Sequence, residues 1–588
     1  PQPIEALNEG LPEVYKELFE TQALLEKHYR DMQDIEFTVQ EGKFYMLQTR
    51  SGKRTGRASI KIAVDMVNEG LINEKEALMR VSPEHVEAFL HPMVDPAAKT
   101  EIVATGLPAS PGGATGKVVF SADEAVVVAR EGNAVVLVRR ETTPEDIHGM
   151  KVAEGILTEL GGMTSHAAVV ARGMGVCAIT GCGGLTIDYE AGTATTADGV
   201  VISRGDVITL DGTAGEVMLG DIPKTEASSS EDFQVLLSWA DKHRRLKVRA
   251  NAETPEDAAK ARELGAEGIG LCRTEHMFFD ADRIDYMRAM ILAENRKERK
   301  KYLKKLLKFQ QEDMLELFRV MDGLPVTVRL LDPPLHEFLP HSEEDMTALA
   351  ERLGKPVEQI RNATEHLSEV NPMLGFRGCR LSVVMPEITE MQVRAIIGAA
   401  VEAVEQGLRP FPEIMIPLVV NVREIRLIND IIDHGIHKVL KEKSVSIPYK
   451  IGTMMETPRA CLGADRLASA VEFMSFGTND LTQMTYGFSR DDAGRFIPDY
   501  LEKKLIESDP FVSLDQRAVG RLLEMAVSES RARKKGLKYG VCGEHGGDPR
   551  SIRFFHDLGL DYVSCSPYRV PVARIAAAQA NVGAELGD

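Results

Sequence analysis

A histidine in a distinctive setting is the first residue of this chain that could do chemistry. Residues 161–166 read Gly-Gly-Met-Thr-Ser-His, and the small-residue run Ala-Ala-Val-Val-Ala follows directly. Glycines allow a tight turn, and Thr and Ser are frequent N-cap residues, so the spacing predicts a helix that begins at His166. The free N–H groups at a helix start favour anions. A phosphoryl group on His166 would be stabilised there; the plain alternative is a capped surface helix with an incidental histidine.

Cys542 is a second candidate, because it ends a short apolar run, in the string Val-Cys-Gly-Glu-His. Other polar side chains end or closely follow further apolar runs: Arg273, Arg329, Asp332, Glu456, Asn479 and Asp480. Chance places some polar residues at such ends. Chance would less easily bring two arginines, three acids, an amide and a thiol to these positions.

This set suggests a site for an anionic substrate and a divalent cation. Glu456 and Asp480 come from neighbouring runs and could share one Mg²⁺, which takes few carboxylates and leaves positions for substrate oxygens. Arg273 and Arg329 offer two guanidinium forks for a phosphoryl group. An enolate would be stabilised as it forms beside such cations.

Further residues extend this hypothesis. Arg377, in a glycine-containing loop outside the strands, could hold a carboxylate. Asn479 and the backbone of Gly477 and Thr478 could bind a carbonyl or enolate oxygen, and Cys542 would act as acid and base at carbon. Each residue taken alone is more often a surface arginine, a capping acid or a core cysteine.

Eight short apolar runs separated by helical stretches must position these side chains. Such alternation is typical of a (β/α)8 barrel, whose catalytic residues lie at the carboxyl ends of the strands. The polar residues above fall at those ends, so we expect an α/β multidomain protein with a C-terminal (β/α)8 barrel. The runs are residues 247–251, 268–271, 326–331, 414–418, 451–456, 473–477, 539–542 and 562–565.

The remaining chain divides where its composition changes. A hairpin is expected at 34–50, and valine-rich strands with glycine turns surround His166. A polar stretch, typical of a flexible linker, then leads into the barrel. The expected segments are residues 1–55, 56–101 (a helical linker segment), 102–222 (the β/α unit with His166), 223–232 (the linker) and 233–588 (the barrel).

Composition narrows the possible classes of function. The chain has 588 residues, of which 44% are hydrophobic and 27% charged, with a formal net charge of −19. This acidity argues against general nucleic-acid binding, and the apolar runs are too short for a membrane span. Seven dispersed cysteines indicate a reducing compartment. We expect a cytoplasmic location, or a plastid one if a longer N-terminus carried a transit peptide.

Three motifs carry a resemblance that runs from about residue 1 to residue 588. Residues 270–278 (Gly-Leu-Cys-Arg-Thr-Glu-His-Met-Phe), 475–483 (Ser-Phe-Gly-Thr-Asn-Asp-Leu-Thr-Gln) and 541–545 are similar to the phosphoryl-binding, metal and acid motifs of enzymes that exchange phosphoenolpyruvate and pyruvate. The string around His166 resembles the phosphohistidine motif of the pyruvate phosphate dikinase family. Within the superfamily, the chain resembles that family most.

The resemblance implies the reversible reaction ATP + phosphate + pyruvate = AMP + diphosphate + phosphoenolpyruvate. It implies a phosphohistidine at His166 on a swivelling domain, proton donation by Cys542, an activating monovalent cation (K⁺ or NH₄⁺) and a homodimer. It implies Mg²⁺ at Glu456 and Asp480, and substrate contacts at Arg273, Arg329, Arg377, Glu456, Gly477, Thr478, Asn479 and Asp480.

The same resemblance assigns the N-terminal hairpin to the closing part of an ATP-grasp nucleotide-binding domain. It matches Thr164 with a threonine that a regulatory protein phosphorylates in plant members. No glycine-rich phosphate loop precedes the hairpin, so we expect the chain to lack most of that domain and to keep at least the phosphoenolpyruvate half-reaction. The matching nucleotide positions are Asp34, Glu36, Gln48 and Arg50.

Three alternative functions stay open. Phosphoenolpyruvate synthase has the same layout but uses water in place of phosphate. Enzyme I of the sugar phosphotransferase system shares the barrel and a phosphohistidine but lacks the hairpin. The third is a phosphohistidine-bearing interaction module without activity. In the enzymatic cases one histidine must reach two sites, so we expect residues 102–222 to turn as one body on the flanking segments near 92–111 and 223–232.

Overall fold

The chain forms two compact units, Pro1–Trp239 and Ala240–Asp588. Within the part of the chain that the structure describes, no helix is both long enough and apolar enough to cross a bilayer. The computed structural model describes residues 4–586 apart from 84–85, 87–92, 96–97, 99, 144–145, 163–164, 166, 169, 172–175, 226–229, 280–282, 341, 491 and 494–495.

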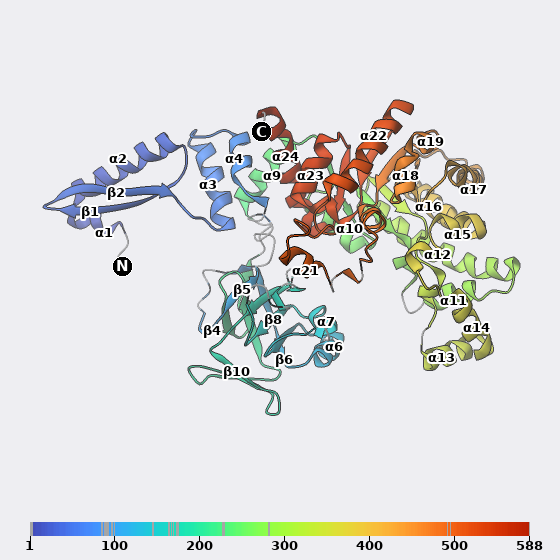
Figure 1. Cartoon of the computed structure of the whole chain (residues 1–588), viewed down its shortest axis with the longest axis horizontal. Helices are drawn as coiled ribbons and strands as arrows, with labels where there is room; N and C mark the ends of the chain where they lie inside the picture. The colour runs from blue at the N-terminus through green and yellow to red at the C-terminus, as the bar shows by residue number, and fades with distance from the viewer. Residues whose placement is uncertain are drawn as a thin grey trace. The chain divides into compact units, whose positions relative to one another are not determined.

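The first unit begins with helices and the predicted hairpin, and α2 lies along one face of that hairpin (Figure 1). The hairpin strands pair antiparallel, and the turn residues Glu41 and Gly42 have φ of 53° and 73°, the backbone that a two-residue turn requires. The elements are α1 (Ala6–Gly10), α2 (Pro12–Tyr29), β1 (Gln33–Gln40), β2 (Lys43–Ser51), α3 (Gly56–Asn68) and α4 (Glu74–Arg80).

An eight-stranded sheet forms the centre of the following segment, in the order β4-β14-β13-β6-β7-β8-β9-β5. Val118 and Val136 pack on one face, and Val119 and Leu137 pack on the other. Burial on both faces explains the continuous valine runs. The strands are β4 (Ile102–Thr105), β5 (Leu107–Ser110), β6 (Gly113–Val119), β7 (Val135–Arg139), β8 (Gly155–Thr158), β9 (Cys177–Thr180), β13 (Val207–Asp211) and β14 (Glu216–Leu219).

Smaller elements complete this segment. β10 (Leu185–Asp188), β11 (Thr193–Thr196) and β12 (Val201–Ser203) form a separate antiparallel sheet. Two helices, α6 (Ala122–Arg130) and α7 (Ile147–Met150), connect the parallel strands β6, β7 and β8.

The segment 223–232 differs from the expected flexible linker at both of its ends. β15 (Lys224–Thr225) pairs with β3 (Met93–Val94), and α9 (Glu231–His243) begins inside the segment. A two-residue strand is held by backbone hydrogen bonds, which no side-chain pattern records. The two acids that open α9 suit the positive end of a helix but read as linker residues in the sequence.

The second unit is a closed parallel barrel whose eight strands follow one another in sequence order, which confirms the predicted (β/α)8 fold. Every predicted run became a strand, and no end shifted by more than three residues. The strands are β16 (Lys247–Asn251), β17 (Ile269–Arg273), β18 (Pro325–Arg329), β19 (Phe411–Ile416), β20 (Lys450–Met455), β21 (Phe473–Phe476), β22 (Lys538–Val541) and β23 (Tyr562–Cys565).

Helices surround this barrel (Figure 1). The second α-helix between β17 and β18, α12, is unusually long. Its second half packs on the barrel core, and its first half joins a second core with α11, α13 and α14. The helices are α10 (Pro255–Glu263), α11 (Ile284–Ile291), α12 (Arg296–Val320), α13 (Glu343–Leu353), α14 (Val357–Leu367), α15 (Cys379–Val384), α16 (Pro386–Glu405), α17 (Val422–Lys443), α18 (Pro458–Leu462), α19 (Ala464–Ala468), α20 (Thr478–Tyr486), α21 (Ile497–Glu502), α22 (Arg521–Arg533), α23 (Pro549–Asp557) and α24 (Val570–Leu586).

Candidate active site

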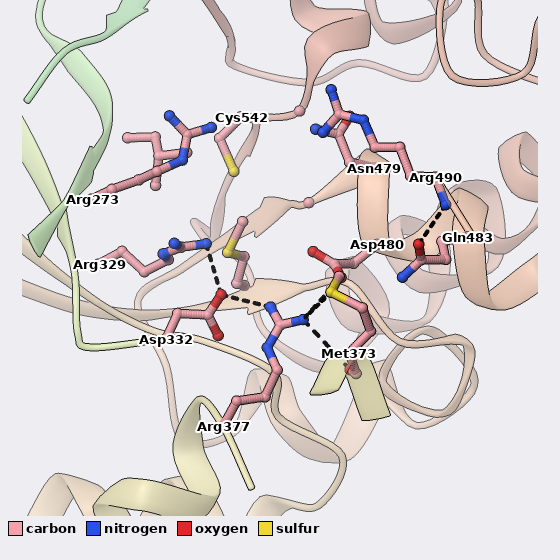
Figure 2. A pocket seen from close by; sticks show the side chains of 14 residues that line it. Arg273, Arg329, Asp332, Met373, Arg377, Asn479, Asp480, Gln483, Arg490 and Cys542 are labelled. Atoms are coloured by element: carbon pink, nitrogen blue, oxygen red, sulfur yellow. Dashed lines mark hydrogen bonds and ion pairs between the residues drawn. The ribbon is translucent and has the colours of Figure 1, made fainter. Parts of the chain in front are cut away.

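A cavity of about 160 Å³ lies at the carboxyl ends of the barrel strands (Figure 2). Its lining combines cationic, anionic and thiol side chains, and most of the barrel residues singled out in the sequence contribute to it. The lining residues are Leu271, Arg273, Arg329, Asp332, Met373, Arg377, Met454, Gly477, Asn479, Asp480, Gln483, Arg490, Cys542 and Gly543.

The ends of neighbouring strands place these residues side by side. Arg273 is the last residue of β17 and Arg329 the last of β18, and the two are direct register partners. Gly477 directly follows β21, and Cys542 directly follows β22. Parallel strands end at one rim of a barrel, so residues from distant parts of the chain meet there.

Asp332 connects two of the arginines. Its Oδ2 atom accepts a hydrogen bond from Arg377 at 2.6 Å and lies 3.0 Å from an Arg329 nitrogen (Figure 2). Burial by itself would raise the pKa of Asp332, but the two guanidinium groups outweigh it and the pKa is lowered. Arg377 also donates to Asp480 at 3.3 Å, and Arg329 pairs with Glu275. The arginines are therefore held in place before any substrate arrives.

Two other arginines reach the cavity with more freedom. Arg273 donates to Glu253 at 2.8 Å and remains partly exposed. Arg490 is exposed, and its backbone N–H donates to Gln483 at 2.8 Å. Among the described residues, no carboxylate pairs with the Arg490 guanidinium, so its charge is available to an anion at the mouth of the cavity.

Glu456 lies just behind the cavity wall and is fully buried. Its Oε1 atom accepts the Leu418 N–H at 2.6 Å, whereas Oε2 is buried without a hydrogen-bond partner. Burial, with the nearby charges of Asp480 and Asp332, raises the pKa of Glu456 to about 8. A Cβ at Gly477 would lie 2.7 Å from Oε2, so only glycine leaves the space in front of this oxygen open.

These features fit a small divalent cation, which the residues present could hold through Glu456 and Asp480. Burial also raises the pKa of Asp480, with a further contribution from Asp332, so the acids repel one another when no cation is bound. In the described part of the chain, no group of three or more Asp, Glu, His or Cys could hold a metal. Two carboxylates suit Mg²⁺, which keeps positions for water and substrate oxygens.

The Cys542 thiol is buried and points into the cavity (Figure 2). It donates to the Phe476 carbonyl at 3.7 Å. Burial raises the pKa of Cys542 to about 11, although the Ser475 hydroxyl lowers it somewhat. The sulfur therefore carries a proton at neutral pH, as a proton donor requires.

A buried histidine orients the segment that follows β21. His545 Nε2 lies 2.8 Å from the Pro510 carbonyl, which can only accept, so Nε2 carries the proton and Nδ1 accepts from the Thr478 hydroxyl at 2.7 Å. Burial lowers the pKa of His545 and keeps it neutral. Asn479 accepts the Glu544 N–H through Oδ1, which leaves its amide NH₂ to donate to a substrate oxygen.

The four predicted nucleotide positions lie together on one exposed face of the hairpin. Asp34 opposes Arg50, and Glu36 opposes Gln48. Arg50 donates to Asp34 at 2.8 Å and lies 3.8 Å from Glu36. The alternation of side chains along paired strands produces this cluster. The assignment of the hairpin to an ATP-grasp domain stays a prediction.

His166 and Thr164 lie outside the described residues. Their neighbour Ser165 accepts the Ala168 N–H through its hydroxyl at 3.4 Å, which is the N-cap bond that the sequence predicted. Ala167, Ala168 and Ala171 are buried in one core of the eight-stranded sheet.

Sequence reasoning gave several lining or supporting residues no role. The sequence places Asp332 near a strand end without indicating its function, and it marks neither Arg490 nor Ser475 as a site residue. The predicted motifs contained a signal for Ser475, because it opens the 475–483 string. Arg490 lies beyond the helix that follows β21, where no periodicity marks it.

Comparison with known proteins agrees with this architecture. A model described as "PEP-utilising enzyme, PEP-binding domain" matches residues 227–582, and "PEP-utilising enzyme, mobile domain" matches 131–215. "Pyruvate phosphate dikinase, AMP/ATP-binding domain" matches residues 9–71, which extends past the expected boundary at residue 55. This match does not support the expectation that most of that domain is lacking.

Three relatives are named pyruvate, phosphate dikinase. The protein from Clostridium symbiosum is 54% identical over 583 residues, covering 99% of this chain and 67% of the relative. That from Rhizobium meliloti (strain 1021) is 55% identical over 585 residues, covering 99% and 65%. The Arabidopsis thaliana protein, named pyruvate, phosphate dikinase 1, chloroplastic, is 54% identical over 583 residues, covering 98% of this chain and 60% of the relative.

The chain thus spans 60% to 67% of the length of these curated relatives. The PEP-binding model alone covers more than half of the chain, and the three models follow one another along the sequence. With this coverage and identity, the chain belongs to the PEP-utilising enzymes, in the pyruvate phosphate dikinase family.

Proposed function

We propose that this chain exchanges phosphoenolpyruvate and pyruvate at the barrel cavity, with His166 as the phosphoryl acceptor. The observation that carries the proposal is the cavity itself. Its lining combines arginines fixed by acids with a protonated thiol, and a buried carboxylate with a free oxygen lies just behind its wall. An anionic substrate with a phosphoryl group and a carbon that must be protonated needs these groups together.

The arginines bind and orient the substrate in this proposal. Arg273 and Arg329, as adjacent register partners, hold the phosphoryl oxygens, and Arg377 holds the carboxylate. The Asn479 amide and the backbone near Gly477 and Thr478 contact the oxygen that becomes the enolate. Mg²⁺ held by Glu456 and Asp480 would neutralise negative charge that builds on substrate oxygens.

Transfer breaks the bond between phosphorus and the enol oxygen and forms a bond between phosphorus and an imidazole nitrogen of His166. The electron pair of the broken bond remains on the enolate. The Cys542 thiol then gives its proton to the methylene carbon, which yields pyruvate and a thiolate that recovers a proton from solvent. The reverse sequence makes phosphoenolpyruvate from pyruvate and phosphohistidine.

The complete activity is proposed from the family. It would be ATP + phosphate + pyruvate = AMP + diphosphate + phosphoenolpyruvate, with a monovalent cation and a homodimer as further expectations. Residues 102–222 would carry His166 between the barrel and a nucleotide site that includes Asp34, Glu36, Gln48 and Arg50. A regulatory role of Thr164 and the extent of the nucleotide domain beyond residues 9–71 stay predictions.

Labelling with phosphoenolpyruvate tests the half-reaction. Phosphoenolpyruvate with ³²P in its phosphoryl group and Mg²⁺ should label the whole chain, and His166→Ala should remove the label. The conservative variant His166→Gln serves as a control for folding. Stable labelling of His166→Ala would reject His166 as the carrier.

Product analysis separates the related activities. Diphosphate formation in a complete protein indicates a dikinase, whereas free phosphate released from ATP indicates a phosphoenolpyruvate synthase. Transfer of label to a small carrier protein indicates an enzyme I-like activity. A chain that takes no label from phosphoenolpyruvate under any of these conditions would favour the interaction module.

A further inference from the structure

Leu418 has a backbone conformation that its side chain disfavours. Its φ is 56°, in the left-handed region that residues other than glycine, asparagine and aspartate rarely occupy. Leu418 is fully buried. The other non-glycine residues with positive φ in the described ranges are all exposed, at helix ends or in turns: Arg30, Glu41, Ser444 and Lys504.

This residue lies at the rim of the barrel that holds the candidate site. It comes two positions after the end of β19, and its N–H donates to Glu456 Oε1 at 2.6 Å. The other oxygen, Oε2, is buried without a partner. The hydrogen bond therefore fixes which carboxylate oxygen of Glu456 is occupied and which is free.

Hydrogen bonds from neighbouring segments hold the backbone on both sides of Leu418. Four consecutive carbonyls, Ile416–Val419, all accept hydrogen bonds. The Ile416 carbonyl accepts from the Thr453 hydroxyl at 3.0 Å, and the Pro417 carbonyl accepts from the Cys379 N–H at 3.1 Å. The Leu418 carbonyl accepts from the Cys379 thiol at 3.3 Å, and the Val419 carbonyl accepts from the Thr457 hydroxyl at 3.3 Å. Strained backbone persists where its neighbours over-determine it, and such strain gathers at functional sites.

The same contact reaches the loop of Arg377. Gly378 follows Arg377 and has φ of 60°, and a Cβ there would lie 2.7 Å from the Leu418 Cβ. The Gly378 N–H donates to the Asp332 carbonyl at 2.8 Å. Leu418 is therefore packed between the loop that carries a substrate arginine and the carboxylate of Glu456.

We infer that Leu418 is a positioning residue whose left-handed backbone aims its N–H at Glu456, so that Oε2 stays free for a divalent cation. The inference rests on the proposed role of Glu456 as a Mg²⁺ ligand. A plain packing role is the alternative, in which the buried side chain of Leu418 matters and its backbone conformation does not.

A substitution series separates the two because they predict opposite orders. If the backbone matters, Leu418→Gly should keep cation affinity best, Leu418→Ala should be intermediate, and Leu418→Val should be worst, because a β-branched residue resists positive φ. If packing matters, Val, the closest of the three in size, should be mildest and Gly worst. Leu418→Met, similar in volume and unbranched at Cβ, is the matched control.

Mn²⁺ alone is the probe, with the free ion measured by electron paramagnetic resonance on the full chain. We expect Leu418→Val to bind Mn²⁺ at least about tenfold more weakly than wild type, a typical loss when a group that orients a ligand is disturbed, and Leu418→Gly to bind within about threefold. The inference would be overturned if the Val variant bound Mn²⁺ best, the Ala variant less well and the Gly variant worst. Ala and Gly alone still decide it if the Val variant does not fold.

A second measurement does not depend on the metal. Hydrogen–deuterium exchange of the peptide spanning residues 414–420 in metal-free protein should show one amide that is slow in wild type and Leu418→Gly and fast in Leu418→Val. Unchanged exchange in Leu418→Val would also reject the inference. Failure of the proposed metal role looks different: Glu456→Gln would then bind Mn²⁺ as wild type does, whatever the Leu418 series shows.

Discussion

Two glutamates on neighbouring strands of the barrel are both fully buried, yet their surroundings differ. Glu413 lies within β19. One of its oxygens accepts from Arg249 at 2.6 Å and from Thr327 at 2.8 Å, and the other lies 3.4 Å from Lys538. Burial opposes ionisation of Glu413, but Arg249 outweighs it and the pKa is lowered.

Glu456, directly after β20, has one oxygen bound by a backbone N–H and one oxygen without a partner. Burial and two nearby carboxylates raise its pKa to about 8. Both glutamates occupy the same barrel, so burial alone does not distinguish them. Both carboxylate oxygens of Glu413 have partners, so we expect this residue to contribute to the stability of the fold. One oxygen of Glu456 has no partner and is left for a cation or a substrate.

Glu456→Gln should have the largest effect on activity. We expect the phosphoenolpyruvate half-reaction to fall roughly 10⁴-fold, because a cation that supplies several kcal/mol of charge stabilisation loses its ligand. Below about pH 4.5, where the Glu456 carboxyl is protonated in both the folded and the unfolded chain, the melting temperature should change little. The measurement is the rate of label transfer from phosphoenolpyruvate at saturating Mg²⁺. Near-normal rates would show that the unpartnered oxygen of Glu456 has no catalytic role.

Glu413→Gln should instead lower the stability of the fold and change label transfer little. Removing one partner leaves Arg249 buried without its counter-charge, so we expect a loss of about 3–5 kcal/mol in the free energy of unfolding. Denaturant unfolding followed by circular dichroism measures it. Arg249→Met combined with Glu413→Leu should recover much of the loss. If Glu413→Gln leaves stability unchanged but removes label transfer, the assignment of this network to the fold is wrong.

The stability contributions of the two glutamates should also respond to pH in opposite directions. The lowered pKa of Glu413 gives stability that is present above the ordinary value of 4.5 and is lost as pH falls through the folded-state pKa. The raised pKa of Glu456 makes metal-free protein most stable below 4.5, with stability declining as pH rises to about 8. Unfolding midpoints of wild type and of each Gln variant, measured from below pH 4.5 up to about pH 8, give the two stability differences, which should depend on pH with opposite signs.

Cys542→Ala tests the acid at carbon. We expect exchange of pyruvate methyl protons with solvent to slow roughly 10²- to 10⁴-fold, the usual contribution of a positioned proton donor. Phosphate label on His166 should still be detectable after long incubation, because the substrate-binding arginines remain. Cys461→Ala, another buried thiol in the same unit, is the matched control. Exchange at the normal rate in Cys542→Ala would move the acid role to another group.

Arg490→Gln should give the smallest effect. The guanidinium is exposed at the mouth, so its contact with an anion is screened by solvent. We expect the KM for phosphoenolpyruvate to rise about tenfold, which corresponds to about 1.4 kcal/mol, with kcat nearly kept. Steady-state kinetics at two salt concentrations measures it. A large fall in kcat would place Arg490 among the groups that act in the transition state.

Local sequence patterns determined much of the fold. The eight barrel strands and the N-terminal hairpin followed from apolar runs, alternation and turn residues, because these signals lie within a few residues of one another. The ends of the apolar runs also predicted that Arg273, Arg329 and Cys542 lie at the carboxyl rim of the barrel, where they line the cavity. The predicted linker at 223–232 omitted a short strand, because that strand depends on a partner strand far away in the sequence.

The pairing of the charged groups depends on contacts between distant parts of the chain. Arg249 and Glu413 lie 164 residues apart, and nothing in either local string marks the other as its partner. Strand order and register bring them together, and they equally leave Glu456 with one free oxygen. The left-handed backbone of Leu418 belongs to this class: no residue preference predicts it, because hydrogen bonds from several separate segments impose it.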